Sequence, residues 1–197
     1  MHTAPRHVII EGLPATGKSE IGNLLKIYFP ESLVYLPELT TEIVRKYKFN
    51  ILDGRRILSD RLIEELPVRK REIRGLLEKM PAAVILEESH IGLHWAYSKV
   101  LADDYLLENY KKLEEHFVKP DLFIRLMQPP VLSIKRQHAR HTPDVAVGIS
   151  LITQMLVNLD EWHAARGHDN LIKLDVNRSP DLVVAEMIRL LGLKYGK

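Results

Sequence analysis

The residues best suited to chemistry lie in one short stretch near the start of the chain. They follow the pattern G-x-x-x-x-G-K-S and are, in order, Gly12, Leu13, Pro14, Ala15, Thr16, Gly17, Lys18 and Ser19. A glycine backbone can wrap closely around an anion with its N–H groups pointing inward. The lysine can reach the terminal phosphates of a nucleotide, and the serine hydroxyl can bind Mg²⁺. The pattern therefore predicts a site for nucleotide phosphates.

The flanks of this stretch have the structure that a phosphate site needs. The β-branched run Val8–Ile10 precedes it and is typical of a buried strand. From Lys18 to about Phe29 the apolar residues recur with helical spacing, so the positive end of a helix would lie at the anion. The alternative is a chance match in a glycine turn, which arises in roughly 1% of chains of this length.

Composition excludes several classes of function. The chain has 197 residues, enough for one well-buried domain and too few for two, so we expect a single domain over 1–197. Its formal net charge of +2 gives no field that would favour a nucleic acid polymer or an anionic membrane as partner. The absence of cysteine excludes a disulfide framework, a thiolate zinc site and a cysteine nucleophile.

No stretch predicts export or insertion into a membrane. The first residues lack the apolar core of a signal peptide, and no apolar run approaches the ~18 residues that span a bilayer. We therefore expect a cytoplasmic protein whose partner is a small molecule. The oligomeric state is left open, a homodimer included.

Strand and helix signals alternate along the chain. Apolar runs typical of buried strands fall at about 7–11, 32–36, 82–86, 121–126 and 170–175. Segments with helical periodicity fall at about 18–29, 40–48, 54–80 (interrupted near Pro67), 94–118, 131–140, 145–166 and 180–191. This alternation predicts an α/β fold with a five-stranded parallel sheet and helices on both faces. In such sheets, ligands bind at the carboxyl ends of the strands.

Carboxylates follow two of the predicted strands at that edge. Glu87 comes directly after the run 82–86, next to Glu88, and Glu38 follows the second strand. We expect Glu87 to reach the phosphate site, where it would accept a hydroxyl proton or hold a magnesium-bound water. The alternative is a solvated strand end. Glu38 is suited either to a sugar hydroxyl or magnesium-bound water, or to capping the helix that follows it.

Arginines suited to phosphate oxygens lie later in the chain. Arg136 and Arg140 are four residues apart and share a face of a predicted helix. The forked guanidinium group matches phosphate geometry, so the region of about 131–145 could close over a bound nucleotide as a lid. The alternative is a solvated basic helix end.

Two further groups could contact a second substrate. The run Arg69–Arg74 is strongly basic and could grip an acceptor phosphate, with Arg74 as a candidate, although a solvated helix face is the preferred interpretation. His90 and His94 follow Glu87 closely, at the edge of the sheet where an acceptor would bind.

A phosphate site alone does not distinguish a switch, a motor and a phosphotransferase. The chain has no guanine-reading N-K-x-D and no L-S-G-G-Q signature, and helicases and transport ATPases are normally larger. A small kinase needs a donor site, carboxylates near Mg²⁺ and the acceptor, and mobile cations over the transferring group. The residues named above match those three needs.

Over nearly its whole length the chain resembles the P-loop nucleoside and nucleotide kinases, especially the deoxynucleoside kinase and thymidylate kinase group. The segments that carry the resemblance are Gly12–Ser19, Pro37–Glu38, Val84–Ser89, Lys119–Leu126, Pro130 with Arg136 and Arg140, and Leu174–Asp175 with Ser179–Pro180. The resemblance implies a three-layer α/β/α fold with strand order 2-3-1-4-5 and a helical lid. It also implies ATP- and Mg²⁺-dependent phosphoryl transfer to a nucleoside or nucleotide.

The resemblance also implies roles for individual residues. Ser19 and Glu87 would be linked to magnesium, and Glu87 would serve catalysis together with Lys18. Arg136 and Arg140 would contact the donor phosphates. Asn177 and Arg178 would lie beside the adenine of ATP.

One departure from the group concerns the end of the third strand. The group usually has an acidic residue followed by Arg, whereas Glu87 is followed here by Glu88. Either an arginine of the run 69–74 replaces the missing cation, or Glu88 faces a different acceptor. Two alternatives therefore stay open: a kinase for a non-nucleotide metabolite or antibiotic, and a nucleotide-binding regulatory protein without transferase activity.

Overall fold

A parallel sheet of five strands forms the centre of the computed structural model, which describes residues 5–49, 54–139 and 148–194. Its strands are β1 (His7–Gly12), β2 (Leu33–Leu36), β3 (Val84–Glu88), β4 (Leu122–Met127) and β5 (Leu171–Asp175). They lie in the order β2-β3-β1-β4-β5, with every neighbouring pair parallel. The predicted sheet and its strand order are confirmed.

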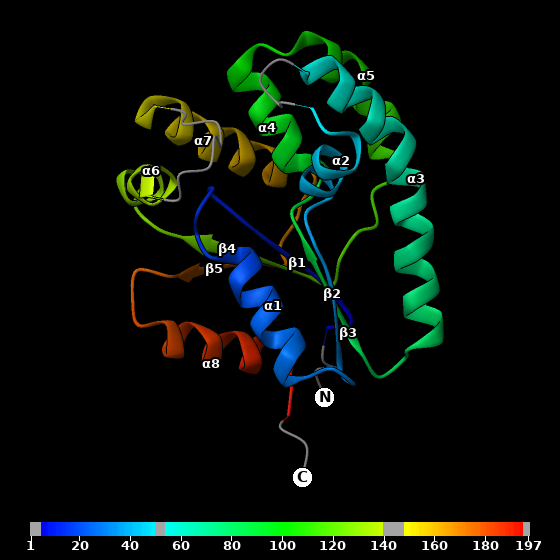
Figure 1. Ribbon diagram of the computed structural model, residues 1–197, viewed down its shortest axis with the longest axis vertical. Coiled ribbons are helices and arrows are strands. Elements are labelled where there is room, and N and C mark those ends of the chain that lie inside the picture. Colours follow the sequence, from blue (N-terminus) through cyan, green and yellow to red (C-terminus); the bar gives the residue numbers. More distant parts are fainter. Residues whose placement is uncertain (1–4, 50–53, 140–147, 195–197) are drawn as a thin grey trace.

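Helices cover both faces of the sheet, as Figure 1 shows. One face carries α1 (Lys18–Tyr28) and α8 (Pro180–Leu191), and their apolar residues share a core with β1, β3 and β4. The other face carries α2 (Leu39–Tyr47), α3 (Arg55–Lys79), α4 (Ile91–Leu101), α5 (Asp104–Glu114) and α7 (Ile149–Ala165). Helix α6 (Pro130–Ala139) packs against α7. The result is the expected three-layer arrangement.

The alternation of side chains along the strands separates the two cores. Val8 and Ile10 of β1 point into the core beneath α1 and α8, whereas Ile9 points into the core beneath α2 to α5 and α7. In β3, Leu86 shares the first core, and Ile85 packs with Ile73 of α3 on the other side. Because side chains alternate in this way, the packing of the apolar residues determines to which face the polar residues at the ends of β1 and β3 point.

Two predicted helices differ from the structure. Helix α3 runs without interruption through Pro67, because the buried residues Leu62, Leu66 and Ile73 hold it against the domain on both sides of the proline. That packing outweighs the hydrogen bond that proline removes. The single helix expected over 94–118 is wrong: α4 begins already at Ile91 and ends at Leu101, and α5 follows as a separate helix.

The break between α4 and α5 has a local cause. Ala102 adopts the left-handed conformation, with φ of 49°, and its N–H bonds to the carbonyl of Ser98. Asp103 then caps α5 by accepting a 3.2 Å hydrogen bond from the N–H of Leu106. Apolar periodicity continues across the break, which is why the pattern indicated one helix.

None of the helices in the described residues is both long enough and apolar enough to cross a membrane.

We predict that Ala102→Gly stabilises the protein by about 0.5–1 kcal/mol, because glycine adopts a positive φ without the strain of a Cβ. The matched control is Gly167→Ala, where φ is 59° and an added Cβ would meet no atom within 4 Å. That variant should lose about 1 kcal/mol from backbone strain alone. Urea unfolding measures both changes, and a destabilised Ala102→Gly would contradict the assignment of the break.

Candidate functional site

The G-x-x-x-x-G-K-S stretch forms a tight loop between β1 and α1. Gly12 has φ of 143°, and a Cβ placed there would lie 2.6 Å from the carbonyl oxygen of Leu126. Gly17, at the N-terminus of α1, has φ of 94°, and Ala15 is left-handed as well, with φ of 56°. Only glycine fits at position 12, because both the backbone conformation and the close approach of β4 exclude a side chain there. The loop thus has the backbone that a phosphate cradle requires.

Polar side chains hold the loop in this shape. Lys18 folds back so that its Nζ lies 3.1 Å from the carbonyl oxygen of Leu13, which also accepts a 2.9 Å bond from the Thr16 hydroxyl. Ser133 of α6 donates a 2.6 Å bond to the carbonyl of Pro14. Helix α6 is therefore attached directly to the loop.

Of the two predicted lid arginines, Arg136 lies in the described part of the chain. Its guanidinium donates a 2.7 Å bond to Gln128 Oε1, and Gln128 Nε2 lies 3.4 Å from the carbonyl oxygen of Ala15. Arg136 is thus linked to the phosphate loop through one side chain. Arg140 lies outside the described residues, as do residues 140–145 of the predicted lid.

The hydroxyl of Ser19 meets Glu88 and not Glu87. Ser19 Oγ donates a 2.9 Å hydrogen bond to Glu88 Oε1, and Glu88 is only 4% exposed. Glu87 points to the opposite face, where its carboxylate lies 3.1 Å from His7 Nε2. The expectation that Glu87 reaches the phosphate site is therefore wrong. Both glutamates belong to β3, where neighbouring side chains point to opposite faces.

Several groups around Glu88 change the pKa of its carboxyl group. Burial raises the pKa of Glu88 above its usual value, against the opposing effects of the Lys18 ammonium and of a hydrogen bond from the Tyr35 hydroxyl. Burial and the neighbouring Glu88 also raise the pKa of Tyr35, so the phenol keeps its proton and acts as the donor. Lys18, Ser19, Tyr35 and Glu88 therefore form one connected group.

Glu38 belongs to the same neighbourhood. It occupies the N-cap position of α2, but its carboxylate accepts a 3.0 Å bond from the Thr41 hydroxyl and none from the helix backbone. Its negative charge contributes to the raised pKa of Glu88. The carboxylates of Glu38 and Glu88 thus lie near each other at the carboxyl ends of the strands, where the phosphate loop also lies.

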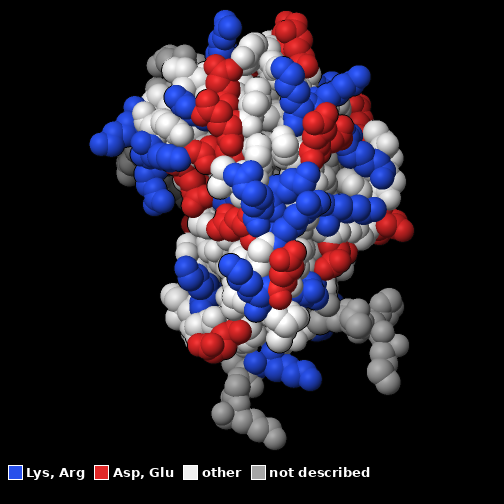
Figure 2. Space-filling model, turned by 90° about the vertical axis from the view of Figure 1, so that its right-hand side faces the viewer, with Lys and Arg blue, Asp and Glu red and all other residues white. Residues whose placement is uncertain are grey.

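The basic run on α3 is mainly solvent-facing. Arg71 and Arg74 are exposed, and Figure 2 shows Lys and Arg side chains gathered on the face that α3 covers, with acidic side chains around them. Arg74 lies one turn before Leu77, whose carbonyl bonds to Arg6 ahead of β1. This position is toward the amino ends of the strands, so the structure does not bring Arg74 to the phosphate loop.

Arg69 is the arginine of this run that the structure buries. It is 5% exposed, donates a 3.1 Å bond to the carbonyl of Pro37, and forms an ion pair with Glu42 of α2. Its second terminal nitrogen, Nη1, has no hydrogen-bond partner among the described residues. Arg69 fastens α3 to the loop after β2.

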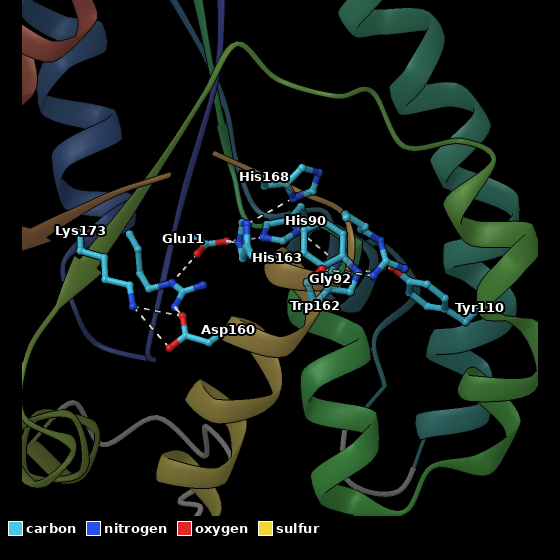
Figure 3. A network of polar contacts seen from close by, with 11 residues as sticks. Glu11, His90, Gly92, Tyr110, Asp160, Trp162, His163, His168 and Lys173 are labelled. Atoms are coloured by element: carbon cyan, nitrogen blue, oxygen red, sulfur yellow. Dashed lines mark hydrogen bonds and ion pairs between the residues drawn. The ribbon is translucent and has the colours of Figure 1, made fainter. Parts of the chain in front are cut away.

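His90 is part of a buried network and not of an acceptor site. Figure 3 shows the carboxylate of Glu11 beside the rings of His90 and His163. Glu11 accepts hydrogen bonds from His90, from His163 at 3.0 Å and from Arg125, and it is fully buried. The expectation that His90 contacts an acceptor is contradicted by this burial, since the ring packs against Trp162 and Phe123.

The charge on Glu11 is stabilised by its neighbours. Burial alone would raise the pKa of this carboxyl, but hydrogen bonds from His163 and His90 and the charge of Arg125 hold it well below its usual range. Arg125 also pairs with Asp160 of α7. The residue directly before the phosphate loop is therefore an ionised carboxylate fixed to β4, α4 and α7.

Glu11, His90 and His163 are close enough together to resemble a metal site. However, His90 Nδ1 accepts a 3.0 Å bond from the N–H of Gly92, so the neutral ring carries its proton on Nε2 and donates it to Glu11. A metal at Nε2 would need that proton removed. The cluster is therefore a hydrogen-bond network. The oxygens of Ser19, Glu88 and Glu38 are the donors that suit Mg²⁺.

Asn177 and Arg178 lie in the exposed turn between β5 and α8. The Asn177 N–H donates a 2.8 Å bond to Asp175, which shapes the turn. Both residues follow the carboxyl end of β5, at the same edge of the sheet as the phosphate loop. Their contact with adenine stays a prediction.

Solved structures with this architecture include a deoxyadenosine kinase and a thymidylate kinase. A deoxyadenosine kinase from M. mycoides with bound dCTP is 15% identical, covers 94% of this chain and 98% of its own, and superimposes with a TM-score of 0.65. The same enzyme with dCMP and dCDP gives 0.68. A thymidylate kinase from Candida albicans is 16% identical, covers 98% of this chain and 93% of its own, and gives 0.64. The chain has the fold of the nucleoside and nucleotide kinases.

No family model and no curated protein matches the chain by sequence. The end of β3 differs in one respect from what the sequence indicated. Because Glu88 and not Glu87 faces Ser19, the residue that follows the carboxylate beside the loop is Ser89. Ser89 has φ of 68°, and its buried hydroxyl has no hydrogen-bond partner among the described residues. Position 89 therefore supplies no cation of its own.

We predict that His94 makes stability depend on pH. Burial lowers the pKa of His94 to about 4, from a usual value of 6.5, and Thr40 lies 3.0 Å from its ring. The unfolded chain therefore binds a proton between pH 6.5 and 4 that the folded chain does not, so stability falls as pH falls through this window.

Urea unfolding at pH 7 and pH 5 measures this effect. His94→Gln should reduce the loss of stability between the two pH values by about 1–2 kcal/mol. His138→Gln, at an exposed position on α6, is the matched control for replacing a histidine. An equal pH dependence in wild type and His94→Gln would exclude His94 as the source.

Proposed function

We propose that the protein is an ATP- and Mg²⁺-dependent kinase that transfers the γ-phosphoryl group to a nucleoside or nucleotide. The observation that carries the proposal is the hydrogen bond between Ser19 and Glu88, at the start of the helix that follows a glycine-constrained loop. In a kinase fold, this hydrogen bond holds a hydroxyl and a carboxylate side by side, next to the position where the loop would bind phosphate.

The donor phosphates would be held by the loop and its attached cations. Backbone N–H groups from Gly12 to Ser19 would bind phosphate oxygens, and Lys18 would exchange its bond to the Leu13 carbonyl for one to a phosphate. Arg136 would reach the same phosphates from α6, because Gln128 already connects it to the loop. These cations stabilise the charge that the transition state spreads over the phosphoryl oxygens.

Magnesium would be held by Ser19 and Glu88. A hydroxyl and a carboxylate are hard oxygen donors, which Mg²⁺ prefers, and it commonly keeps several waters. When bound, the ion neutralises charge on the donor phosphates. The protein's own contribution is to fix the two oxygens at the N-terminus of α1.

The acceptor would bind beside Glu38. The acceptor oxygen forms a new bond to the γ-phosphorus as the bond from that phosphorus to the ADP oxygen breaks. For a hydroxyl acceptor, the proton passes to the Glu38 carboxylate, which the Thr41 hydroxyl orients at the end of β2.

Lys18→Ala should abolish turnover while the protein stays folded. Among the described residues, the hydrogen bonds of Lys18 go to loop carbonyls, so its loss removes phosphate contacts and little packing. ADP release should fall more than about 100-fold, with an unchanged circular dichroism spectrum. Lys26→Ala, at an exposed position of the same helix, is the control and should retain activity.

The same assay, run over a panel of acceptors, separates the proposed function from its alternatives. A nucleoside or nucleotide that raises both ADP release and the melting temperature beyond ATP alone supports the proposal. Stimulation only by sugars or antibiotics would indicate a kinase for another metabolite. ATP binding with no ADP release in any mixture would indicate a regulatory protein and contradict the kinase.

Glu87 and Glu88 point to opposite faces of the sheet, and this leads to a second prediction about their effects on kcat. Glu88→Gln should lower kcat by on the order of 100-fold, because it removes the charge that faces Ser19. Glu87→Gln should leave kcat within about threefold, because Glu87 bonds to His7 on the other face. The reverse pattern would contradict the site, since the two substitutions are chemically identical.

A further inference from the structure

A tyrosine from β2 lies over the start of α1 because a glycine there makes room for it. A Cβ built on Gly22 would lie 2.2 Å from Cε2 of the Tyr35 ring, so any side chain at position 22 would displace the ring. Tyr35 is only 6% exposed, and its ring belongs to the core shared by β1, β3 and α1. Packing of the ring thus directs its hydroxyl to a fixed place.

The hydroxyl of Tyr35 contacts the carboxylate of Glu88, which faces the phosphate loop. It donates a hydrogen bond to Glu88 Oε2, and Ser19 donates to the other oxygen, Oε1, at 2.9 Å. One donor on each oxygen leaves the carboxylate a single orientation. Three elements converge on it: Glu88 ends β3, Ser19 lies in the first turn of α1 and Tyr35 lies within β2.

We propose that Tyr35 is a positioning residue for the magnesium site, which aims the Glu88 carboxylate at the ion's place beside Ser19. This inference rests on the proposed function, because it gives Glu88 its role in holding Mg²⁺. Tyr35 acts through its hydrogen bond to one oxygen and does not touch the nucleotide. Gly22 belongs to the same arrangement, since it lets the ring approach α1.

A core tyrosine without this role would give a different result when only its oxygen is removed. Tyr35→Phe keeps the ring, its packing against Gly22 and the core. It removes the donor to Glu88 and leaves that carboxylate free to rotate. Loss of a partner that orients a metal ligand typically weakens metal binding by about 10–100-fold.

The test measures magnesium binding without turnover. The melting temperature of the protein with ADP is followed as Mg²⁺ is added, for wild type, Tyr35→Phe and Tyr28→Phe. Tyr28 lies exposed on α1 and is the matched control for loss of a phenol oxygen. We expect Tyr35→Phe to need about 10-fold more Mg²⁺ for half of the Mg²⁺-dependent shift, with each shift measured from that variant's own melting temperature with ADP alone.

Activity assays add a second readout. The Mg²⁺ concentration for half-maximal ADP release should rise by the same factor, while KM for ATP at saturating Mg²⁺ stays unchanged. Gly22→Ala should reproduce this effect, because it displaces the ring and the hydroxyl together. A variant that fails to fold is recognised from its melting curve, and Tyr35→Phe then decides alone.

The outcomes separate this inference from the function on which it rests. If wild type shows a Mg²⁺-dependent shift with ADP and Tyr35→Phe shows the same midpoint, Tyr35 is only a core residue and the inference is overturned. If wild type shows no Mg²⁺-dependent shift at all, both the magnesium site and the kinase are overturned.

Discussion

Neighbouring residues of a strand point to opposite faces of a sheet, and this alternation arranges the contacts around the phosphate loop. Val8, Ile10 and Leu86 face the core beneath α1, so Glu88, two residues after Leu86, reaches Ser19 at the start of that helix. A shift of β3 by one residue would exchange Glu87 and Glu88 and at the same time move Leu86 out of its core. The core that stabilises the sheet thus also selects the carboxylate at the site.

The same alternation sends Glu11, directly before the loop, to the opposite face. Burial of an ion costs several kcal/mol unless partners compensate it, and Arg125, His90 and His163 supply that compensation here. Loss of a single partner from such a group typically costs about 3–5 kcal/mol. These partners come from β4, α7 and the N-cap of α4, so they fix the end of β1 relative to three other elements. The phosphate loop begins at this point, and the network therefore gives it a rigid base.

The sequence predicted the fold well because its signals are local and repeated. Apolar runs located every strand, and G-x-x-x-x-G-K-S located the loop, where Gly12 proves to be the only residue type that fits. The break at Ala102 and the continuity of α3 through Pro67 were missed for opposite reasons. A non-glycine residue in the left-handed conformation leaves no clear sequence signal, and tertiary packing held a helix that proline alone would weaken.

The site was predicted less completely because its partners come from distant elements. The apolar run 82–86 favours Glu87, which follows it, because Val84, Ile85 and Leu86 do not differ in polarity and so do not show which face meets the loop. The packing of Val84 and Leu86 in the core beneath α1 is what selects Glu88. Tyr35, Gln128 and Ser133 had no motif to mark them, and their contacts depend on how β2, β4 and α6 lie around the loop. His90 has the position expected for an acceptor contact, but its bond to Glu11 places it in the core.

The central claim is that this loop delivers a phosphoryl group from ATP to a small acceptor. Phosphorus-31 NMR of the protein with ATP, Mg²⁺ and a mixture of nucleosides and nucleoside monophosphates observes the destination of that group directly. The account predicts that the γ-phosphate signal is lost while ADP and a new phosphate ester or diphosphate of one acceptor grow in equal amounts. Appearance of inorganic phosphate alone, or an unchanged spectrum with a folded and ATP-bound protein, would contradict it.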